Sequence, residues 1–128
     1  MAHVLETGFE ILNRENPNGS PTVMGYNIIN GELRSASDGE TFESRNPAWL
    51  DDCLGVFPLS KKEDVHDALI SAREAFSQWS QTPAPTRGQI IGNMGRLLME
   101  HKDDIVRVES REIGKTLKES AGEVQEAI

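Results

Sequence analysis

The feature that most constrains the fold of this chain is a helical period in its apolar residues that begins shortly after Ser60. From that point large apolar side chains recur every three or four residues, the spacing that places them on one face of an α-helix. Ser60 precedes Glu63 by three residues, which predicts a capping box at the helix start. We expect the first apolar series to form a buried face; it comprises Val65, Leu69, Ala72, Phe76 and Trp79.

Further helices are expected downstream, giving about four in all. Pro83 and Pro85 end the first helix and start the second, where Thr86 and Gln89 predict a weaker capping box. Its predicted buried face comprises Ile90, Ile91, Met94, Leu97 and Leu98. Residues 102–104 indicate a break before a third helix, which ends at Gly114, a residue suited to the left-handed position past a helix end. A fourth apolar series consists of Leu117, Ala121, Val124 and Ile128.

Short strands are predicted upstream of the helices. Asn30-Gly31 lies between the apolar segments 26–29 and 32–34, and Asn-Gly tolerates the positive φ angles of a type I′ hairpin turn. Two more strands are plausible at 41–43 and 53–57, which completes a small antiparallel meander. Residues 1–25 show no sustained period and contain a cluster of turn-forming residues. We expect this N-terminal arm to be loosely ordered.

These segments predict an α/β chain in three stretches: the arm 1–25, a hairpin or meander at 26–59, and a helical part at 60–128. The strands are too few and too short to form a sheet that covers four helical faces. We therefore expect the chain to be an incomplete part of a larger fold, from a shortened product or an interrupted reading frame.

Composition excludes several classes of function. Asp plus Glu number 21 against 13 for Lys plus Arg, and a formal net charge of −8 disfavours nucleic-acid binding. No segment approaches the roughly 20 apolar residues that span a bilayer, so no membrane association is expected. The single cysteine excludes a disulfide framework within one chain, which favours a reducing, cytoplasmic setting.

Individual reactive residues give no convincing catalytic or metal site. Cys53 alternates with apolar residues in a predicted strand, where a buried thiol commonly acts as a small hydrophobic group. The histidines, His3, His66 and His101, are scattered and lack metal-ligand spacing. The acidic pairs at 51–52, 63–64 and 103–104 are predicted to be solvated turns or first turns of helices.

Gly114-Lys115-Thr116 resembles the end of a phosphate-binding loop, but this function is rejected. The position five residues before Gly114 is Glu109 where the motif requires glycine. The segment also follows the C-terminal end of a predicted helix, where the helix dipole repels anions.

As an ordered set, the motifs resemble the aldehyde dehydrogenase superfamily over residues 26–128, about four-fifths of the chain. The matching motifs are Ile29-Asn30-Gly31-Glu32, Gly39-Glu40-Thr41-Phe42, Asn46-Pro47, the helix from Glu63 to Trp79, Pro85-x-Arg87-Gly88 and Arg111-Glu112-x-Gly114-Lys115. Within the superfamily, the segments 83–88, 110–115 and 122–126 are most similar to the antiquitin branch of α-aminoadipic semialdehyde dehydrogenases.

The resemblance implies a three-domain, oligomeric enzyme that oxidises an aldehyde or semialdehyde to a carboxylic acid with NAD or NADP. In that family a cysteine thiolate attacks the carbonyl, hydride passes to the cofactor and a glutamate-activated water releases the acid. The family's nucleophile, glutamate and cofactor lysine all match positions beyond Ile128. We therefore assign no catalytic or cofactor-binding residue here, and expect this chain alone to be inactive and to bind no cofactor.

One site is implied by the resemblance. Some family members hold a monovalent cation through a carbonyl just before Asn-Pro and an acidic side chain before Gly-Lys. The matching positions are Arg45 and Glu112, although aspartate is the commoner residue at the second. A surface carboxylate near a helix end is an equal alternative for Glu112. The rival hypothesis for the whole chain is a free-standing helical module that binds a partner protein through its apolar stripes.

Overall fold

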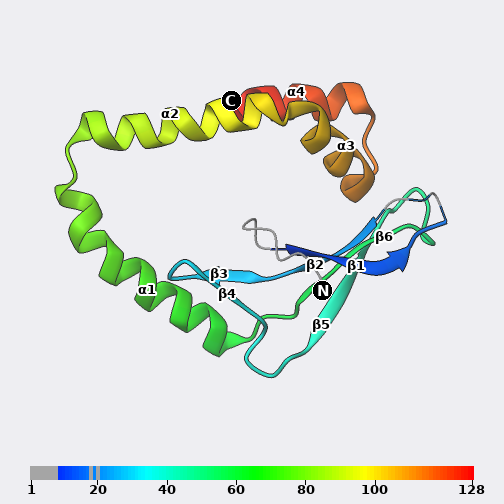
Figure 1. The fold of residues 1–128 in the computed structure, drawn as a ribbon, viewed down its shortest axis with the longest axis horizontal. Helices are drawn as coiled ribbons and strands as arrows, with labels where there is room; N and C mark the ends of the chain where they lie inside the picture. The colour runs from blue at the N-terminus through cyan, green and yellow to red at the C-terminus, as the bar shows by residue number, and fades with distance from the viewer. Residues whose placement is uncertain (1–8, 18, 20) are drawn as a thin grey trace. The chain divides into compact units, whose positions relative to one another are not determined.

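The computed structural model describes residues 9–17, 19 and 21–128. The described residues form two compact units, one up to Gln78 and the other from Trp79 to Ile128. Six strands and four helices lie within the described residues (Figure 1). The strands are β1 (Phe9–Glu15), β2 (Pro21–Gly25), β3 (Asn27–Ile29), β4 (Glu32–Arg34), β5 (Thr41–Arg45) and β6 (Cys53–Pro58). The helices are α1 (Lys62–Gln81), α2 (Ala84–Glu100), α3 (Lys102–Ile113) and α4 (Leu117–Ala127). The predicted combination of short strands followed by helices is confirmed.

The main sheet has the order β1-β2-β6-β5 and is mixed, not antiparallel throughout as predicted. β2 pairs in parallel with β6, with Val23 opposite Gly55, whereas both outer pairs are antiparallel. A Cβ atom added at Gly55 would lie 2.8 Å from the Val23 side chain and equally close to the Phe57 ring. Glycine at this position therefore lets the Phe57 ring fold across the backbone of β6.

In the described part of residues 1–25, two strands replace the predicted loose order; residues 1–8, 18 and 20 lie outside the described residues. Strands β1 and β2 occupy residues 9–15 and 21–25 and pair as an antiparallel hairpin. The turn-forming residues between them close this hairpin, with Gly19 donating its N–H to the Asn16 carbonyl at 2.8 Å. Turn-forming composition was a correct signal for the connection, but it concealed the strands on either side.

The predicted Asn30-Gly31 hairpin is confirmed. Asn30 has φ 54° and Gly31 has φ 75°, so both central residues lie in the left-handed region that a type I′ turn requires. The hairpin β3–β4 forms a separate two-stranded sheet and does not extend the main one. Ile29 is buried, whereas its neighbour Ile28 is exposed. The alternation identifies the face of the hairpin that is covered.

Helix α1 begins at Lys62, and the predicted Ser60–Glu63 capping box is not the arrangement at its start. The Ser60 hydroxyl bonds to Asn27 Oδ1 at 3.0 Å, while the Asp64 carboxylate accepts the Lys61 N–H at 2.7 Å. Asp64 stands where a capping box places its acidic residue, so it satisfies the first orphan amide of the helix. The helix start was therefore predicted one residue too early.

The apolar stripe of α1 forms as predicted but is exposed in this chain. Phe76 and Leu69 are each 65% exposed and Val65 is 55% exposed. The helix residues of lowest exposure lie on an adjacent face, at Asp64, Ala68 and Ser71. The prediction of a buried Val65–Trp79 face is therefore wrong within this chain, because the period shows which side chains share a face but not what covers it.

Helix α2 starts at Ala84 with Pro83 before it and no side-chain cap, so the predicted Thr86–Gln89 box lies inside the helix instead. None of its residues is buried. The predicted apolar face is again exposed, as Ile91 at 59% illustrates. Helix α2 ends at Glu100 and α3 starts at Lys102, so the break lies at His101. Residues 102–104, predicted to be the break, form the first turn of α3 instead.

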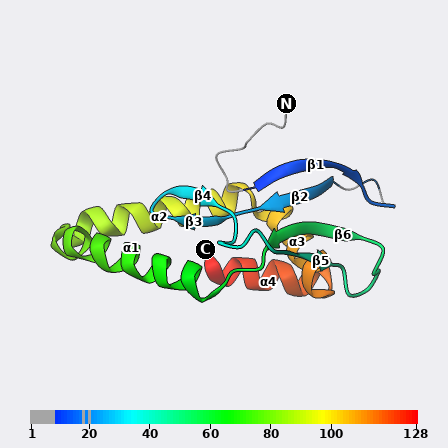
Figure 2. The same ribbon diagram turned by 90° about the horizontal axis from the view of Figure 1, so that it is seen from below.

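Helices α3 and α4 lie side by side (Figure 2), with Val106 and Val124 buried. Gly114 ends α3 with φ 79°, as predicted. Thr116 and Glu119 form a complete capping box at the start of α4, which was not predicted. The buried face of α4 contains Ser120 and Val124, whereas Leu117 from the predicted stripe is 57% exposed. Among the described residues, no helix is both long and apolar enough to cross a membrane.

Candidate functional site

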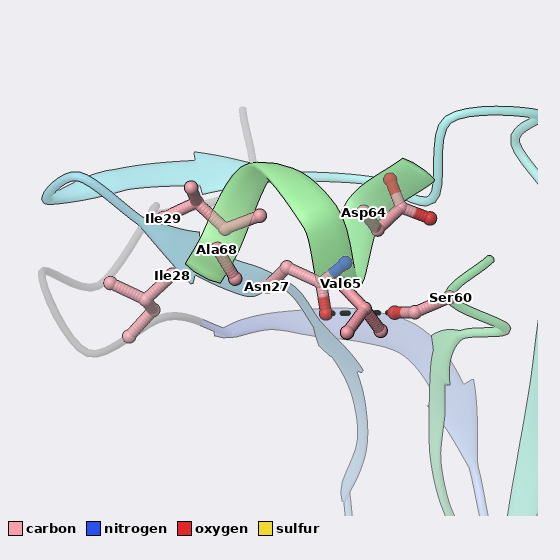
Figure 3. A pocket seen from close by; sticks show the side chains of 7 residues that line it. All are labelled: Asn27, Ile28, Ile29, Ser60, Asp64, Val65 and Ala68. Atoms are coloured by element: carbon pink, nitrogen blue, oxygen red, sulfur yellow. Dashed lines mark hydrogen bonds between the residues drawn. The ribbon is translucent and has the colours of Figure 1, made fainter. Parts of the chain in front are cut away.

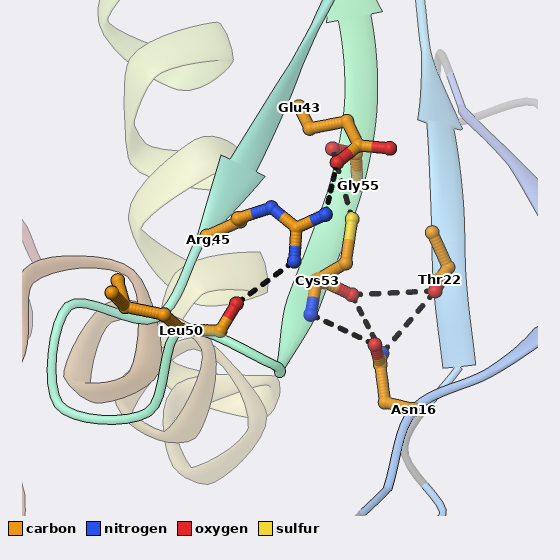
Figure 4. A network of polar contacts seen from close by, with 7 residues as sticks. All are labelled: Asn16, Thr22, Glu43, Arg45, Leu50, Cys53 and Gly55. Atoms are coloured by element: carbon orange, nitrogen blue, oxygen red, sulfur yellow. Dashed lines mark hydrogen bonds and ion pairs between the residues drawn. The ribbon is translucent and has the colours of Figure 1, made fainter.

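Arg45, the first residue of the predicted cation site, is the last residue of β5 and pairs with Cys53 of β6 across a register irregularity. Its guanidinium donates to the Leu50 carbonyl at 2.8 Å and forms an ion pair with Glu43 (Figure 4). These contacts hold the start of the Asn46-Pro47 loop against the sheet. The Arg45 backbone is therefore fixed by both its strand and its side chain.

The loop that follows Arg45 is held by bonds within it. Asn46 accepts the Ala48 N–H on its side-chain oxygen at 2.9 Å and donates its own backbone N–H to the Asp52 carbonyl at 3.0 Å. The Asp52 N–H donates to the Trp49 carbonyl at 2.9 Å. Asp52 is fully buried and accepts Asn46 Nδ2 at 3.2 Å. The prediction that residues 51–52 are solvated is therefore wrong for Asp52, whose carboxylate closes the loop.

Cys53 is a buried free cysteine on β6, as predicted. Its sulfur lies 3.8 Å from the Gly55 carbonyl oxygen, an acceptor that cannot take the thiol proton as a base would. Both backbone polar groups of Cys53 bond to the side chain of Asn16, and Thr22 adds a 3.3 Å bond to its carbonyl (Figure 4). This geometry supports a structural role for Cys53.

Glu112, the second predicted cation-site residue, lies in the last turn of α3 in the other compact unit and is exposed. The segment after it is held by Ser110, whose hydroxyl donates to the Lys115 carbonyl at 2.7 Å. In the described part of the chain, no group of three or more His, Cys, Asp or Glu side chains is placed to hold a metal ion. His66 and His101 are both exposed.

A charged cluster joins α3 to α4 through Glu109, Lys115 and Glu123. Lys115 forms an ion pair with Glu123, and this hydrogen bond raises the pKa of Lys115 and lowers that of Glu123. A second hydrogen bond, between the two carboxyl groups, raises the pKa of Glu109. The cluster fixes the connection after Gly114. It is unsuited to phosphate, because the Lys115 ammonium lies beside the carboxyl groups of Glu109 and Glu123.

Asp64 is the centre of another group of polar contacts, between the β3–β4 hairpin and the start of α1. Its carboxylate accepts the Lys61 N–H and, at 2.9 Å, the Ser37 N–H; the first bond is the largest cause of its lowered pKa. Asp64 also lines a hollow of about 180 Å³ between β3 and the start of α1 (Figure 3). The prediction that residues 63–64 are solvated is wrong for Asp64, which is 9% exposed.

Comparison with known proteins decides the family. A model described as the aldehyde dehydrogenase family matches residues 34–128, from the end of β4 to the last residue. The chain belongs to the aldehyde dehydrogenase family. The match includes β5, the Asn46-Pro47 loop, β6 and all four helices, whereas the Ile29–Glu32 motif of the predicted resemblance lies before its first residue.

Named aldehyde dehydrogenases resemble the chain over most of its length. It is 38% identical over 102 residues to α-ketoglutarate semialdehyde dehydrogenase of Haloferax volcanii. This alignment covers 80% of this chain and 21% of that protein. The chain is 39% identical over 102 residues to malonate-semialdehyde dehydrogenase of Bacillus cytotoxicus, with the same coverage. A crystal structure of betaine aldehyde dehydrogenase from Staphylococcus aureus in complex with NAD⁺ matches with a TM-score of 0.74 and 30% identity, over 78% of this chain and 20% of that one.

The chain spans about a fifth of the length of the curated aldehyde dehydrogenases that it matches. The fold prediction of an α/β segment with small sheets and four helices agrees with the corresponding part of those structures. Sequence analysis missed the polar residues that hold this segment together. Asp64, Asn16 and Asp52 had no local pattern that marked them as buried.

Proposed function

We propose that this chain is the N-terminal part of an NAD- or NADP-dependent aldehyde dehydrogenase that oxidises a semialdehyde to a carboxylic acid. The observation that carries the proposal is the family match over residues 34–128, made by a chain that covers about a fifth of its relatives. The enzyme named α-ketoglutarate semialdehyde dehydrogenase and the one named malonate-semialdehyde dehydrogenase support the substrate class. The complex of betaine aldehyde dehydrogenase with NAD⁺ supports the cofactor class.

In this proposal the chain supports the enzyme structurally. The exposed apolar faces of α1 and α2 are the surfaces on which the rest of the subunit packs, because large apolar stripes are rarely left open to solvent. The thiolate, the cofactor site and the base that activates water belong to the remainder of the enzyme. Cys53 is buried in a strand and takes no part in the chemistry.

The finer substrate assignment is also a proposal. The segments 83–88, 110–115 and 122–126 resemble the antiquitin branch, which favours α-aminoadipic semialdehyde. The relatives described above are named for malonate and α-ketoglutarate semialdehydes instead. An assay of the complete enzyme against these three semialdehydes distinguishes the assignments, and preference for an aldehyde without a second functional group would contradict all of them.

We further propose that the Arg45 carbonyl and the Glu112 carboxylate bind a monovalent cation in the complete enzyme. The hydrogen-bonded loop after Arg45 supports this assignment, because it fixes the backbone that would supply the carbonyl ligand. Glu112→Gln should weaken the dependence of thermal stability on K⁺ or Na⁺, whereas Glu126→Gln on α4 should not. Equal salt dependence in the two variants would remove Glu112 from the site.

The nucleotide sequence after the Ile128 codon tests the assignment as part of an enzyme. Codons for a dehydrogenase segment with a cysteine nucleophile, in frame or after a frameshift, would support it. A stop codon with no such remnant would favour the free-standing module that binds a partner protein.

We propose a cytoplasmic homo-oligomer for the complete enzyme, and sedimentation of that protein tests its assembly.

A further inference from the structure

The turn of the β3–β4 hairpin combines a reactive sequence with an open position. Asn30 and Gly31 are both exposed, and no heavy atom lies within 4 Å of the place where a Gly31 Cβ would stand. Asn30 is therefore open to water, and no residue beyond its chain neighbours crowds Gly31. The turn also lies outside the four-stranded sheet, so its opening does not require that sheet to break.

Asparagine followed by glycine can react without an enzyme. The Gly31 backbone nitrogen attacks the side-chain amide carbon of Asn30, a C–N bond forms, and ammonia leaves to give a cyclic succinimide. Water then opens the ring at either carbonyl, which yields aspartate or isoaspartate. Glycine favours the first step because no side chain crowds the attacking nitrogen. We propose that Asn30 is a site of spontaneous deamidation whose rate is set by opening of the β3–β4 hairpin.

The folded turn slows the reaction. Asn30 is held in the left-handed conformation of a type I′ turn, at φ 54°. Closure of the succinimide ring requires rotation about the Asn30 Cα–C bond, which the paired hairpin restricts. Each strand of the hairpin has only three residues, and an isolated two-stranded hairpin is marginally stable in water. Its attachment to α1 supplies the missing stability. Ile29, 7% exposed, lies beside Ala68 in the hollow, and Ser60 bonds to Asn27 at 3.0 Å (Figure 3).

The two products have different consequences for the hairpin. Aspartate tolerates the left-handed conformation, so it retains the turn and adds one negative charge beside Glu32. Isoaspartate inserts an extra methylene into the backbone, and a two-residue turn with that insertion cannot keep Ile29 opposite Glu32. Isoaspartate at position 30 therefore detaches the hairpin from α1.

Mass spectrometry of the whole chain, aged at neutral pH and then digested with trypsin, measures the reaction. Cleavage after Arg14 and Arg34 releases one peptide that contains Asn30, Asn27 and the Asn18-Gly19 pair, so fragment ions must separate these positions. Asn27 precedes the β-branched Ile28 and serves as the internal control. We expect severalfold faster conversion at Asn30 than at Asn27, with isoaspartate among the products. Equal rates at the two positions would overturn the proposal.

A matched pair of variants tests whether hairpin opening sets the rate. Ile29→Ala shortens a buried side chain that lines the hollow between β3 and α1, and it should accelerate conversion of Asn30 severalfold. Ile28→Ala, at a position 64% exposed, should leave the rate unchanged. The chain in concentrated urea gives the rate for a fully open turn, and circular dichroism shows whether each variant retains its helices. If wild type already reacts at the rate measured in urea, or if Ile29→Ala retains its helices and reacts no faster than wild type, the hairpin does not control the reaction.

Discussion

The side-chain amide of Asn16 bonds to both backbone polar groups of Cys53, 37 residues later in the chain. Asn16 Oδ1 accepts the Cys53 N–H at 2.8 Å, and Asn16 Nδ2 donates to the Cys53 carbonyl at 2.6 Å. Asn16 thus bonds to the start of β6 much as a neighbouring strand would. Both residues are buried, so water cannot replace these bonds if the amide is lost.

Replacing Asn16 by alanine should lower the free energy of unfolding by about 1–3 kcal/mol, because it leaves the buried N–H and C=O of Cys53 without these partners. Urea unfolding of the chain measures the change. Asn93→Ala, at an exposed position in α2, is the control and should be neutral or slightly stabilising. A loss no larger for Asn16→Ala than for this control would show that the connection between β1 and β2 does not anchor β6.

The Asp64 carboxylate should make the first unit sensitive to acid. Its pKa in the folded chain is lowered chiefly by the Lys61 N–H, with Ser37 adding to the effect. Its stabilising contribution is therefore complete above roughly pH 3.9, the ordinary aspartate pKa, and is lost as the pH falls through the lower folded value. Asp64→Asn should destabilise the chain at neutral pH, and the difference from wild type should shrink on acidification. Urea unfolding at several pH values measures this difference.

Glu63→Gln is the matched control for the acid prediction, because Glu63 is exposed in the same helical turn and lies outside the Ser37–Lys61 contacts. Its difference from wild type should be the smaller one at neutral pH. A difference for Asp64→Asn that grows as the pH falls would contradict the assigned role of the carboxylate.

Glu109→Gln should stabilise the α3–α4 pair at neutral pH. The raised pKa of Glu109 means that its ionised form is disfavoured in the folded chain beside Glu123, so stability is lost as the pH rises through that pKa. Glutamine keeps an N–H donor for the hydrogen bond to Glu123, the largest cause of the raised pKa, and carries no charge. Its advantage should therefore shrink as the pH falls and wild-type Glu109 gains a proton. Thermal unfolding at a series of pH values measures the effect, with Glu126→Gln as control. Destabilisation by Glu109→Gln at neutral pH would show that Glu109 has an attractive role.

Replacement of Phe76 should have a small effect in this chain and a large one in the complete enzyme. In the 128-residue chain it is 65% exposed, so Phe76→Ala should change stability by no more than about 0.5 kcal/mol. In the complete enzyme we propose that the same side chain is buried, where its truncation should cost about 3–5 kcal/mol. Denaturant unfolding of both proteins provides the comparison. Similar small losses in both would mean that the α1 stripe is not covered by the rest of the subunit.

Local patterns in the sequence predicted the elements whose conformation is locally determined. The Asn30-Gly31 turn and the end of α3 at Gly114 were predictable because glycine and asparagine adopt positive φ angles more readily than other residues. The Thr116–Glu119 capping box has an equally clear local pattern and was overlooked. At α1 the pattern of Ser60 and Glu63 is present, but Asp64 caps the helix instead and also accepts the N–H of Ser37, 27 residues earlier.

The remaining features depend on contacts that a local pattern does not encode. The parallel pairing of β2 with β6 joins Val23 to Gly55, and the Asn16 bonds to Cys53 span a similar separation. The helical period correctly grouped Val65, Leu69 and Phe76 on one face, yet it could not show that these side chains are exposed in this chain. For the cation site, Arg45 and Glu112 were selected by resemblance alone, and that site stays a prediction.

Aldehyde-dependent formation of NADH or NADPH tests the central claim most directly, when the purified 128-residue chain is compared with the product of a gene that continues past Ile128. We expect the complete product to oxidise a semialdehyde, and the chain alone to give no signal above the enzyme-free blank. Turnover by the chain alone that survives Cys53→Ala would contradict the account, because the chemistry would then reside in residues assigned a structural role. Turnover abolished by Cys53→Ala would contradict it as well, by showing that this buried thiol is a nucleophile.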